Sequence, residues 1–299
     1  MTSYLVTGAS GFVGQHLIGE LRRRGDPVVP VDGSLDVRSA EFAEVIARAR
    51  PEVVIHLAAL SSVADSWERP EEYHDVNVGG TERVLTALVR ARPGARCLVV
   101  SSAEVYGVVS PDEVPLTEDS PLRPVNPYAE TKARSEEVAR RFTEDLEVVI
   151  LRPFTHTGPG QSERFVVPAF AARLLRALRD GDSEIPVGNL EARRDFSDVR
   201  DVVRAYLAAG ERGVPGATYN VASGVGRSIR EIADELRDVI YPSARLVVES
   251  SLLRPVENPV LIGSAEALCR ETRWRAELPW ASTLRDVVDD VRRRLEVRP

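Results

Sequence analysis

The chain has 299 residues, of which 43% are hydrophobic and 28% charged, and its formal net charge is −7. This composition is typical of a globular protein and excludes the disordered, fibrous and membrane-spanning classes. The acidic balance without a basic stripe argues against a nucleic-acid partner, and the absence of an apolar run of membrane length argues against a membrane partner. Cys97 and Cys269 are far apart, and the four histidines do not cluster. We therefore expect no metal site and a cytoplasmic location.

Short apolar runs, typical of buried strands, alternate with amphipathic stretches of helical period through the first half of the chain. The runs lie at residues 4–8, 27–32, 52–59, 96–102 and 147–153. Such strands separated by helices predict an α/β fold with a doubly wound parallel (Rossmann) sheet, because right-handed crossovers place helices on both faces.

The alternation of apolar runs and helical stretches ends at about residue 153. Loop-rich segments then follow, interleaved with helical patterns at 169–181, 199–211 and 228–240. We expect a first domain at residues 1–153 and, at 154–299, mainly a smaller C-terminal region packed over the carboxyl edge of the sheet. Some later segments are expected to return to the first domain. Ligands of open parallel sheets bind at that edge, so the C-terminal region is expected to hold the substrate.

The glycines of TGASGFVG directly follow the first strand and begin a helix. Gly8 allows a tight turn, Gly11 lets the backbone approach a pyrophosphate, and Gly14 permits close packing of the helix on the strand. The unpaired N–H groups of the helix N-terminus, at Phe12 and Val13, would bind that pyrophosphate. The strand before and the amphipathic helix after supply the context that a lone glycine triplet lacks. Residues 1–153 are therefore predicted to bind NAD(H) or NADP(H).

Acidic residues follow the second strand. Asp32 ends that strand, where a carboxylate accepts hydrogen bonds from ribose hydroxyls and repels a 2′-phosphate, which slightly favours NAD(H) over NADP(H). Asp36 is a second candidate, able to reach the adenine amino group, with Val37 beside it. The end of the third strand is also expected to contact the cofactor, through Leu57, Ala58 and Ala59.

Lys132 is the only lysine among the 39 lysines and arginines of the chain. Asn126 and Pro127 predict a helix start, an N-cap followed by proline at the first helical position, which places Tyr128 and Lys132 on one face. An ammonium beside the phenol is expected to lower the phenol's pKa from about 10. The same lysine can hold the ribose of a nicotinamide cofactor, and the broad fork of arginine is no simple substitute. We predict that Tyr128 and Lys132 are catalytic and bind the cofactor.

The end of the fourth strand supplies a third catalytic candidate. SSAEVYG offers Ser101 and Ser102, and we choose Ser102 as the hydroxyl that hydrogen-bonds a substrate carbonyl oxygen while Tyr128 transfers its proton. Glu104, two residues further, is a candidate for substrate binding or for acid–base catalysis.

These motifs make the chain similar to the extended short-chain dehydrogenase/reductase family, the NAD-dependent epimerases and dehydratases that act on nucleotide-diphosphate sugars. The motifs TGASGFVG, HLAA, SSAEVYG, PYAETKA, RRDFSDVRDVV, YNVASG and RPVE carry the resemblance nearly end to end. Ser102, Tyr128 and Lys132 match the family's catalytic trio. Several longer segments, GPGQSERFVVPAFA among them, most resemble members that reduce a C4 ketone. The resemblance implies hydride delivery from a reduced nicotinamide to C4 of a nucleotide-linked 4-keto-6-deoxyhexose, above all GDP-4-keto-6-deoxy-D-mannose, giving GDP-rhamnose.

The resemblance also implies residues that bind the substrate. Arg194 and Arg254 match positions that hold the phosphates of the sugar nucleotide, a task that suits the fixed, delocalised donors of arginine. Glu257 matches a position that takes ribose hydroxyls, and Thr155 stands at a substrate contact where the family often has Asn. The stretch after Asp32 is shorter than usual and close relatives often prefer NADPH, so both cofactors stay open.

Other activities of the same family are alternatives. A 4-epimerase needs the same trio and a sugar free to rotate, and a dTDP-linked 4-keto-6-deoxyhexose is a second possible reductase substrate. A 4,6-dehydratase would use Glu104 to abstract the C5 proton, although the dehydratases with an Asp-Glu pair carry Asp at the position of Ala103. A non-catalytic redox sensor would be expected to have a broken trio. By family analogy, the helices containing GTERVLTALVRA and AETKARSEEVARRF predict a homodimer.

Overall fold

The centre of the molecule is a sheet of six short, mostly apolar strands. The computed structural model describes residues 2–249, 252 and 258–296. The sheet consists of β1 (Tyr4–Thr7), β2 (Val28–Val31), β3 (Val53–His56), β4 (Arg96–Val100), β5 (Glu147–Pro153) and β9 (Thr218–Val221). Every pairing in the order β2-β1-β3-β4-β5-β9 is parallel. The predicted doubly wound α/β fold is confirmed.

Helices cover both faces of this sheet because successive strand residues point to opposite sides. One layer is formed by α1 (Phe12–Arg24) and α8 (Val199–Arg212), and the other by α2 (Ala40–Ala49), α5 (Gly80–Ala91) and α6 (Pro127–Arg140). On β1, for example, Val6 packs in the core of the α1 and α8 layer, and Leu5 packs in the core of the other layer. Both side chains are fully buried, so each face of the sheet has its own apolar core.

Short helical segments complete the connections on the side where the strands end. These are α3 (Val63–Glu68), α4 (Pro70–Tyr73), the π-helix η1 (His74–Gly79) and the 3-10 helix η2 (Ala103–Tyr106). Since α4, η1 and α5 follow one another without a gap, the wide π-helical turn lies inside a longer helical run. The π-helix and α6 pack against each other, which brings η1 close to the helix that carries the lone lysine.

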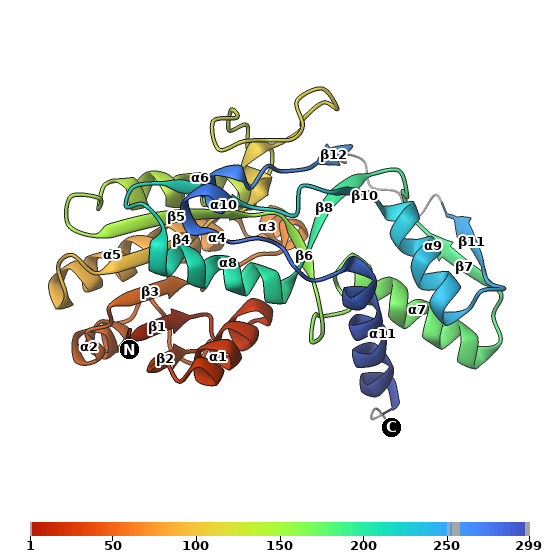
Figure 1. Ribbon diagram of the computed structural model, residues 1–299, viewed down its shortest axis with the longest axis horizontal. Helices are drawn as coiled ribbons and strands as arrows, with labels where there is room; N and C mark the ends of the chain where they lie inside the picture. Colours follow the sequence, from red (N-terminus) through yellow and green to blue (C-terminus); the bar gives the residue numbers. More distant parts are fainter. Residues whose placement is uncertain (1, 250–251, 253–257, 297–299) are drawn as a thin grey trace.

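A second region lies beside the carboxyl end of the sheet (Figure 1). Its strands are β6 (Thr155–Thr157), β7 (Glu184–Val187), β8 (Arg193–Asp198), β10 (Gly226–Ser228), β11 (Arg245–Val248) and β12 (Val260–Leu261). Its helices are α7 (Val166–Asp180), α9 (Ile229–Ile240) and α11 (Trp280–Glu296). The three helices and the strands β7 and β8 share one apolar cluster, so this region has a core of its own.

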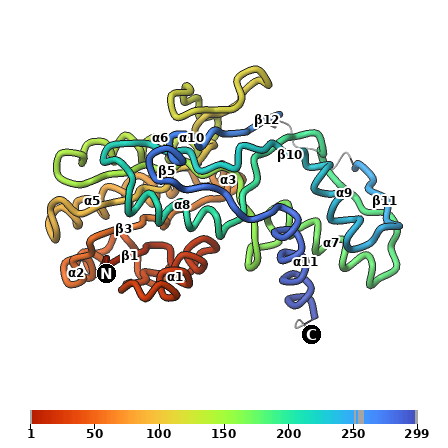
Figure 2. The backbone as a smooth tube through the Cα atoms, in the orientation of Figure 1, coloured from red at the N-terminus to blue at the C-terminus, as the bar shows by residue number. Residues whose placement is uncertain are grey.

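The chain passes between the two regions several times. Strand β9 joins the central sheet beside β5, and α10 (Glu266–Thr272) packs on α8. In Figure 2 the C-terminal segment runs past α10, above the sheet, before it enters α11 in the second region. The central sheet therefore draws on residues from both sides of position 153. In the described part of the chain, no helix is both long and apolar enough to cross a membrane.

Candidate active site

The turn between β1 and α1 brings the backbone unusually close to the end of β3. Gly8 has a φ of +67°, and a Cβ there would lie 2.9 Å from the backbone nitrogen of Ala58. A Cβ on Gly14 would lie 2.2 Å from the carbonyl oxygen of Gly8, so the first turn of α1 packs directly on the loop. Gly11 is the N-cap and offers no side chain to the helix. The N–H groups of Phe12 and Val13 therefore begin a helix whose N-terminus suits a phosphate group.

This turn lies at the point where the strand order reverses, since β1 pairs with β2 on one side and with β3 on the other. Open parallel sheets bind ligands at such a switch point. The hydroxyl of Thr7, which sequence reasoning missed, accepts hydrogen bonds at 3.1 Å from the N–H groups of Leu57 and Ala58. It thereby fixes the end of β3, including Ala59, beside the glycine turn. The glycine positions and the close packing fit a dinucleotide cofactor.

The acidic residues after β2 are exposed, as a contact with an adenosine ribose requires. Asp32 accepts hydrogen bonds from the Ser34 hydroxyl at 2.6 Å and the Ser34 N–H at 2.9 Å, and these bonds lower the pKa of Asp32. Asp36 instead forms an ion pair with Arg38 at 2.6 Å, and Arg38 also pairs with Asp75. Val37 is buried. The ion pairs of Arg38 with these two acidic residues were not predicted from the sequence.

The start of α6 follows the predicted pattern. The Asn126 side chain accepts a hydrogen bond from the N–H of Ala129 at 2.8 Å, and Pro127 is the first helical residue. Tyr128 and Lys132 are both buried, at 8% and 7% exposed. The Lys132 ammonium donates to the carbonyl oxygen of Val100, at the end of β4, at 2.8 Å. Burial lowers the pKa of Lys132 to about 8, and Glu136 acts against this fall.

The hydroxyl of Ser102 meets the phenol of Tyr128. Ser102 accepts the N–H of Glu104 at 3.2 Å, which leaves the serine O–H free to donate. A hydrogen bond joins Ser102 to Tyr128 and favours the charged form of the phenol. The structure thus brings Ser102 and Tyr128 into contact, and holds Lys132 one helical turn further along α6.

The expected fall in the pKa of Tyr128 is wrong. Burial raises the pKa of Tyr128 to about 12, and the negative charge of Glu104 adds to the rise, while the bond from Ser102 opposes it. The physical reason is that the phenol is almost completely buried in the fold, and removal of the phenolate from water outweighs the help of a neighbouring donor. At neutral pH Tyr128 is therefore a neutral phenol, the form that can give up a proton.

A cleft of about 690 Å³ lies between the sheet and the second region. Its lining brings together the predicted substrate residues Glu104, Thr155 and Arg194. Burial raises the pKa of Glu104, and Arg194 and a hydrogen bond from Asn126 oppose this rise. The cleft also contains Asn126, which the sequence suggested only as a helix cap, and the half-exposed Phe165 at the start of α7. Of the other predicted substrate residues, Arg254 and Glu257 lie outside the described residues.

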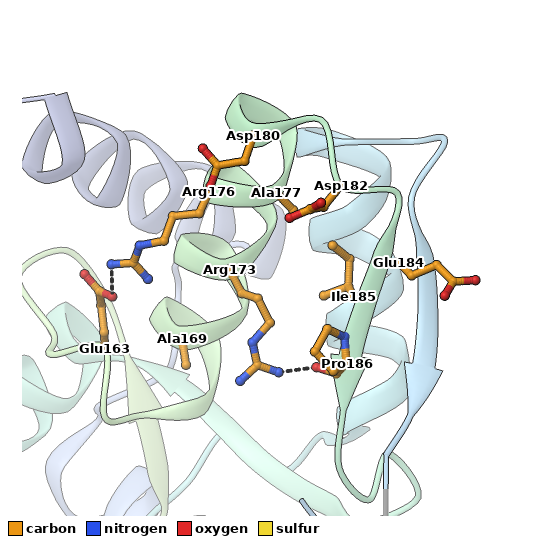
Figure 3. Close-up of a pocket in the computed structure, with 10 residues that line it drawn as sticks. All are labelled: Glu163, Ala169, Arg173, Arg176, Ala177, Asp180, Asp182, Glu184, Ile185 and Pro186. Carbon is orange, nitrogen blue, oxygen red and sulfur yellow. Dashed lines mark hydrogen bonds and ion pairs between the residues drawn. The ribbon is translucent and has the colours of Figure 1, made fainter.

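A second cavity, of about 310 Å³, shares part of its lining with this cleft. Figure 3 shows Arg173 and Arg176 on α7, where Arg176 bonds Glu163 and Arg173 bonds the carbonyl oxygen of Pro186. Glu163 and Arg173 line both cavities. Among the residues that the structure describes, no group of three or more His, Cys, Asp or Glu side chains could hold a metal ion.

Comparisons with known proteins find similar sequences and similar folds. The profile of the "NAD dependent epimerase/dehydratase family" matches residues 4–222. The chain is 34% identical to "GDP-6-deoxy-D-mannose reductase" of Pseudomonas aeruginosa over 291 residues, which cover 95% of each protein. It superposes with a TM-score of 0.89 on the structure of RMD from Pseudomonas aeruginosa complexed with NADPH, at 31% identity over 98% of this chain and 100% of that one. A UDP-glucose 4-epimerase of Thermus thermophilus, solved with NAD, gives a TM-score of 0.85 at 26% identity over 97% of this chain and 99% of that one.

Proposed function

We propose that this chain, which belongs to the NAD-dependent epimerase/dehydratase family, is an enzyme that reduces the C4 ketone of a nucleotide-diphosphate 4-keto-6-deoxyhexose. One observation carries the proposal. The neutral, buried phenol of Tyr128 is hydrogen-bonded to Ser102, and the ammonium of Lys132 lies one helical turn away. The 34% identity to a GDP-6-deoxy-D-mannose reductase supports GDP-4-keto-6-deoxy-D-mannose as the substrate and GDP-rhamnose as the product.

The cofactor in this proposal is NAD(H) or NADP(H). Its pyrophosphate would lie on the turn of Gly8, Gly11 and Gly14, where an added Cβ would meet backbone atoms. When bound, the reduced nicotinamide supplies a hydride to the C4 carbon of the sugar. Asp32 and Asp36 would face the adenosine ribose and adenine, and the ionised carboxylate of Asp32 favours NAD(H). Val37 and the end of β3, from Leu57 to Ala59, would contact the same cofactor.

The residues of the trio have different tasks in this reaction. Tyr128 gives its phenolic proton to the oxygen that develops negative charge at C4. Ser102 donates a hydrogen bond, first to the ketone oxygen and then to the phenolate that remains on Tyr128. Lys132, held at the end of β4 by the carbonyl of Val100, supplies the positive charge that stabilises this phenolate. Solvent then returns the proton to Tyr128.

The substrate would lie in the cleft of about 690 Å³. Arg194 would bind its pyrophosphate together with Arg254, and Glu257 would take ribose hydroxyls. Thr155 and Glu104 would contact the sugar, since both line the same cleft. Two arginines suit a pyrophosphate because each offers several fixed donors and a charge that does not titrate near neutral pH.

A screen of nucleotide sugars tests the proposed function. The enzyme is supplied with NADH or NADPH and with GDP-, dTDP- or UDP-linked 4-keto-6-deoxyhexoses, and cofactor oxidation is followed by absorbance. The proposal predicts oxidation with the GDP sugar and an NMR spectrum of a 4-hydroxy-6-deoxy product. A lack of oxidation with every 4-keto sugar contradicts it, and oxidation with the dTDP sugar alone moves the substrate to the second candidate.

A 4-epimerase is the second candidate function, and the likeness to the Thermus thermophilus UDP-glucose 4-epimerase favours it. It would use the same trio, but it would interconvert 4-hydroxy sugars with no net change in NADH. A 4,6-dehydratase would depend on Glu104, whose raised pKa suits an acid–base role. Product NMR without added NADH distinguishes both from a reductase. A homodimer through α5 and α6 is also part of the proposal, and light scattering tests it.

A further inference from the structure

A buried ion pair lies one helical turn beyond Lys132. Glu136 on α6 is 1% exposed and Arg152 on β5 is 3% exposed. The Arg152 guanidinium donates two hydrogen bonds to the Glu136 carboxylate, from Nε to Oε1 at 2.9 Å and from Nη2 to Oε2 at 2.7 Å. A buried pair of this kind adds little to stability, because desolvation of both charges offsets their attraction. Its place between the catalytic helix and the sheet therefore calls for another explanation.

The pair is tied to the strand end that carries the active site. The hydroxyl of Ser101 donates to Glu136 Oε1 at 2.6 Å. Ser101 follows Val100, whose carbonyl oxygen accepts the Lys132 ammonium, and it precedes Ser102, which bonds Tyr128. The Glu136 carboxylate thus holds Ser101 in place. Ser101 lies between Val100, which binds the lysine, and Ser102, which binds the phenol.

Arg152 anchors this carboxylate to the rest of the fold. Its Nη1 donates to the Tyr106 hydroxyl and to the Glu118 carbonyl oxygen, both at 3.0 Å. Tyr106 in turn donates to Asn220 on β9 at 2.7 Å. The short polar contacts of Glu136 are thus with Ser101, directly after β4, and with Arg152 on β5, and a longer ion pair joins it to the exposed Arg140 at 3.4 Å.

The charges around Lys132 come from three elements. Glu136, on the same helix, stabilises the ammonium. His56 on β3 is buried between the hydroxyls of Thr7 and Thr81, and burial together with Lys132 keeps this imidazole neutral. Tyr128, also on α6, is neutral at ordinary pH, and Glu104 on η2 acts on the phenol of Tyr128. The carboxylate of Glu136 is therefore the negative charge that supports the ammonium.

We propose that Glu136 is a positioning residue for the proposed reductase, which fixes Ser101 so that Ser102 and Val100 meet Tyr128 and Lys132. The inference rests on the proposed function, since the trio is the machinery that Glu136 positions. Glu136 is almost fully buried and lines neither of the two cavities described above, so it would touch neither substrate nor cofactor. Its effect should appear in the rate of the chemical step and in the pH range of activity, with little change in binding.

The test compares Glu136→Gln with Glu137→Gln, the same change at the exposed neighbouring position of α6. In Glu136→Gln, kcat is expected to fall roughly ten- to hundredfold, because a small displacement of the trio is costly, while KM for NADH and for the sugar nucleotide stays nearly constant. The wild-type kcat should decline as the pH rises through about 8, where Lys132 loses its proton. Without the Glu136 charge, this decline should move about one pH unit lower. Glu137→Gln should leave both properties unchanged.

Ser101→Ala separates the two effects and serves if Glu136→Gln does not fold. This variant keeps the Glu136 charge but removes the hydrogen bond from Ser101 to Glu136. We therefore expect kcat to fall, while the pH at which activity declines stays as in the wild type. A merely structural Glu136 would lower the unfolding temperature and leave kcat of the folded enzyme and its pH profile as in the wild type. The inference is overturned if Glu136→Gln keeps the kcat and pH profile of the wild type. It is also overturned if Ser101→Ala keeps the kcat of the wild type.

The wild-type assay keeps this test apart from the test of the proposed function. If the wild type turns over 4-keto sugars and the variants match it, the positioning role fails while the reductase stands. If the wild type oxidises no NADH or NADPH with any 4-keto sugar, the proposed function fails, and so does the role of Glu136 in it.

Discussion

Replacement of Gly14 by alanine is expected to push α1 away from the turn that follows β1. A Cβ at this position would lie 2.2 Å from the Gly8 carbonyl oxygen and 2.9 Å from the Cα of Ala9. Favourable contacts between heavy atoms need about 3.5 Å or more, so the helix must move by about 1 Å, because backbone atoms cannot rotate out of the way. Overpacking of this kind costs about 1–3 kcal/mol of folding free energy.

The same movement would displace the N–H groups at the start of α1. We expect the Kd for NADH or NADPH to rise about tenfold or more, which corresponds to about 1.4 kcal/mol of binding free energy. Thermal unfolding measures the first effect, at about 2–4 °C per kcal/mol for a chain of this class. A fluorescence titration with the reduced cofactor measures the second.

Gly19→Ala is the matched control on the same helix. No atom lies within 4 Å of a Cβ at Gly19, and alanine in a helix interior is favoured over glycine by up to about 1 kcal/mol. This variant should unfold at the wild-type temperature or above and bind the cofactor normally. If Gly14→Ala behaved like Gly19→Ala in both assays, the close approach of helix and turn would not support cofactor binding.

Three further variants test individual residues of the site. Asp32→Ala should raise kcat/KM for NADPH relative to NADH by about tenfold, because it removes a charge that repels a 2′-phosphate; an unchanged ratio removes Asp32 from cofactor selection. Lys132→Arg should lower kcat about a hundredfold or more, since a guanidinium does not replace the compact, buried ammonium at the Val100 carbonyl; a near-normal kcat contradicts our account of the lone lysine. Arg194→Ala should raise KM for the nucleotide sugar about tenfold or more with kcat little changed, whereas Arg193→Ala, at the exposed neighbouring position, should not; equal KM values in the two variants would exclude Arg194 from phosphate binding.

Features made by neighbours in the chain could be predicted from the sequence. The start of α6 is one, because its cap, its first-turn proline and the spacing of Tyr128 and Lys132 all lie within seven residues. The glycine turn is another, since a positive φ at Gly8 and tight packing at Gly14 depend on the loop itself. The apolar runs predicted the five strands of the first half, because buried parallel strands need apolar residues on both faces.

Contacts between segments that are far apart in the chain could not be predicted from the sequence. Strand β9 joins the sheet beside β5 after a long stretch that contains β6, α7, β7, β8 and α8. The residues of β9 themselves do not indicate which strand it pairs with. Thr7 and Asn77 look like ordinary polar residues, yet Thr7 fixes the end of β3, and Asn77 bonds both Leu60 and Thr131. The rise in the pKa of Tyr128 depends on burial of the phenol in the fold. The spacing of Tyr128 and Lys132 in the sequence does not reveal that burial.

The most direct measurement follows NADH or NADPH oxidation with GDP-4-keto-6-deoxy-D-mannose in the wild type and in Tyr128→Phe. We predict one cofactor oxidised for each sugar reduced by the wild type. The phenylalanine variant should keep most of its affinity for the cofactor but lose about a thousandfold in kcat, within the range expected for removal of a general acid. A variant that kept its rate would show that the proton comes from elsewhere, and a wild type that left the cofactor unoxidised would contradict the reductase itself.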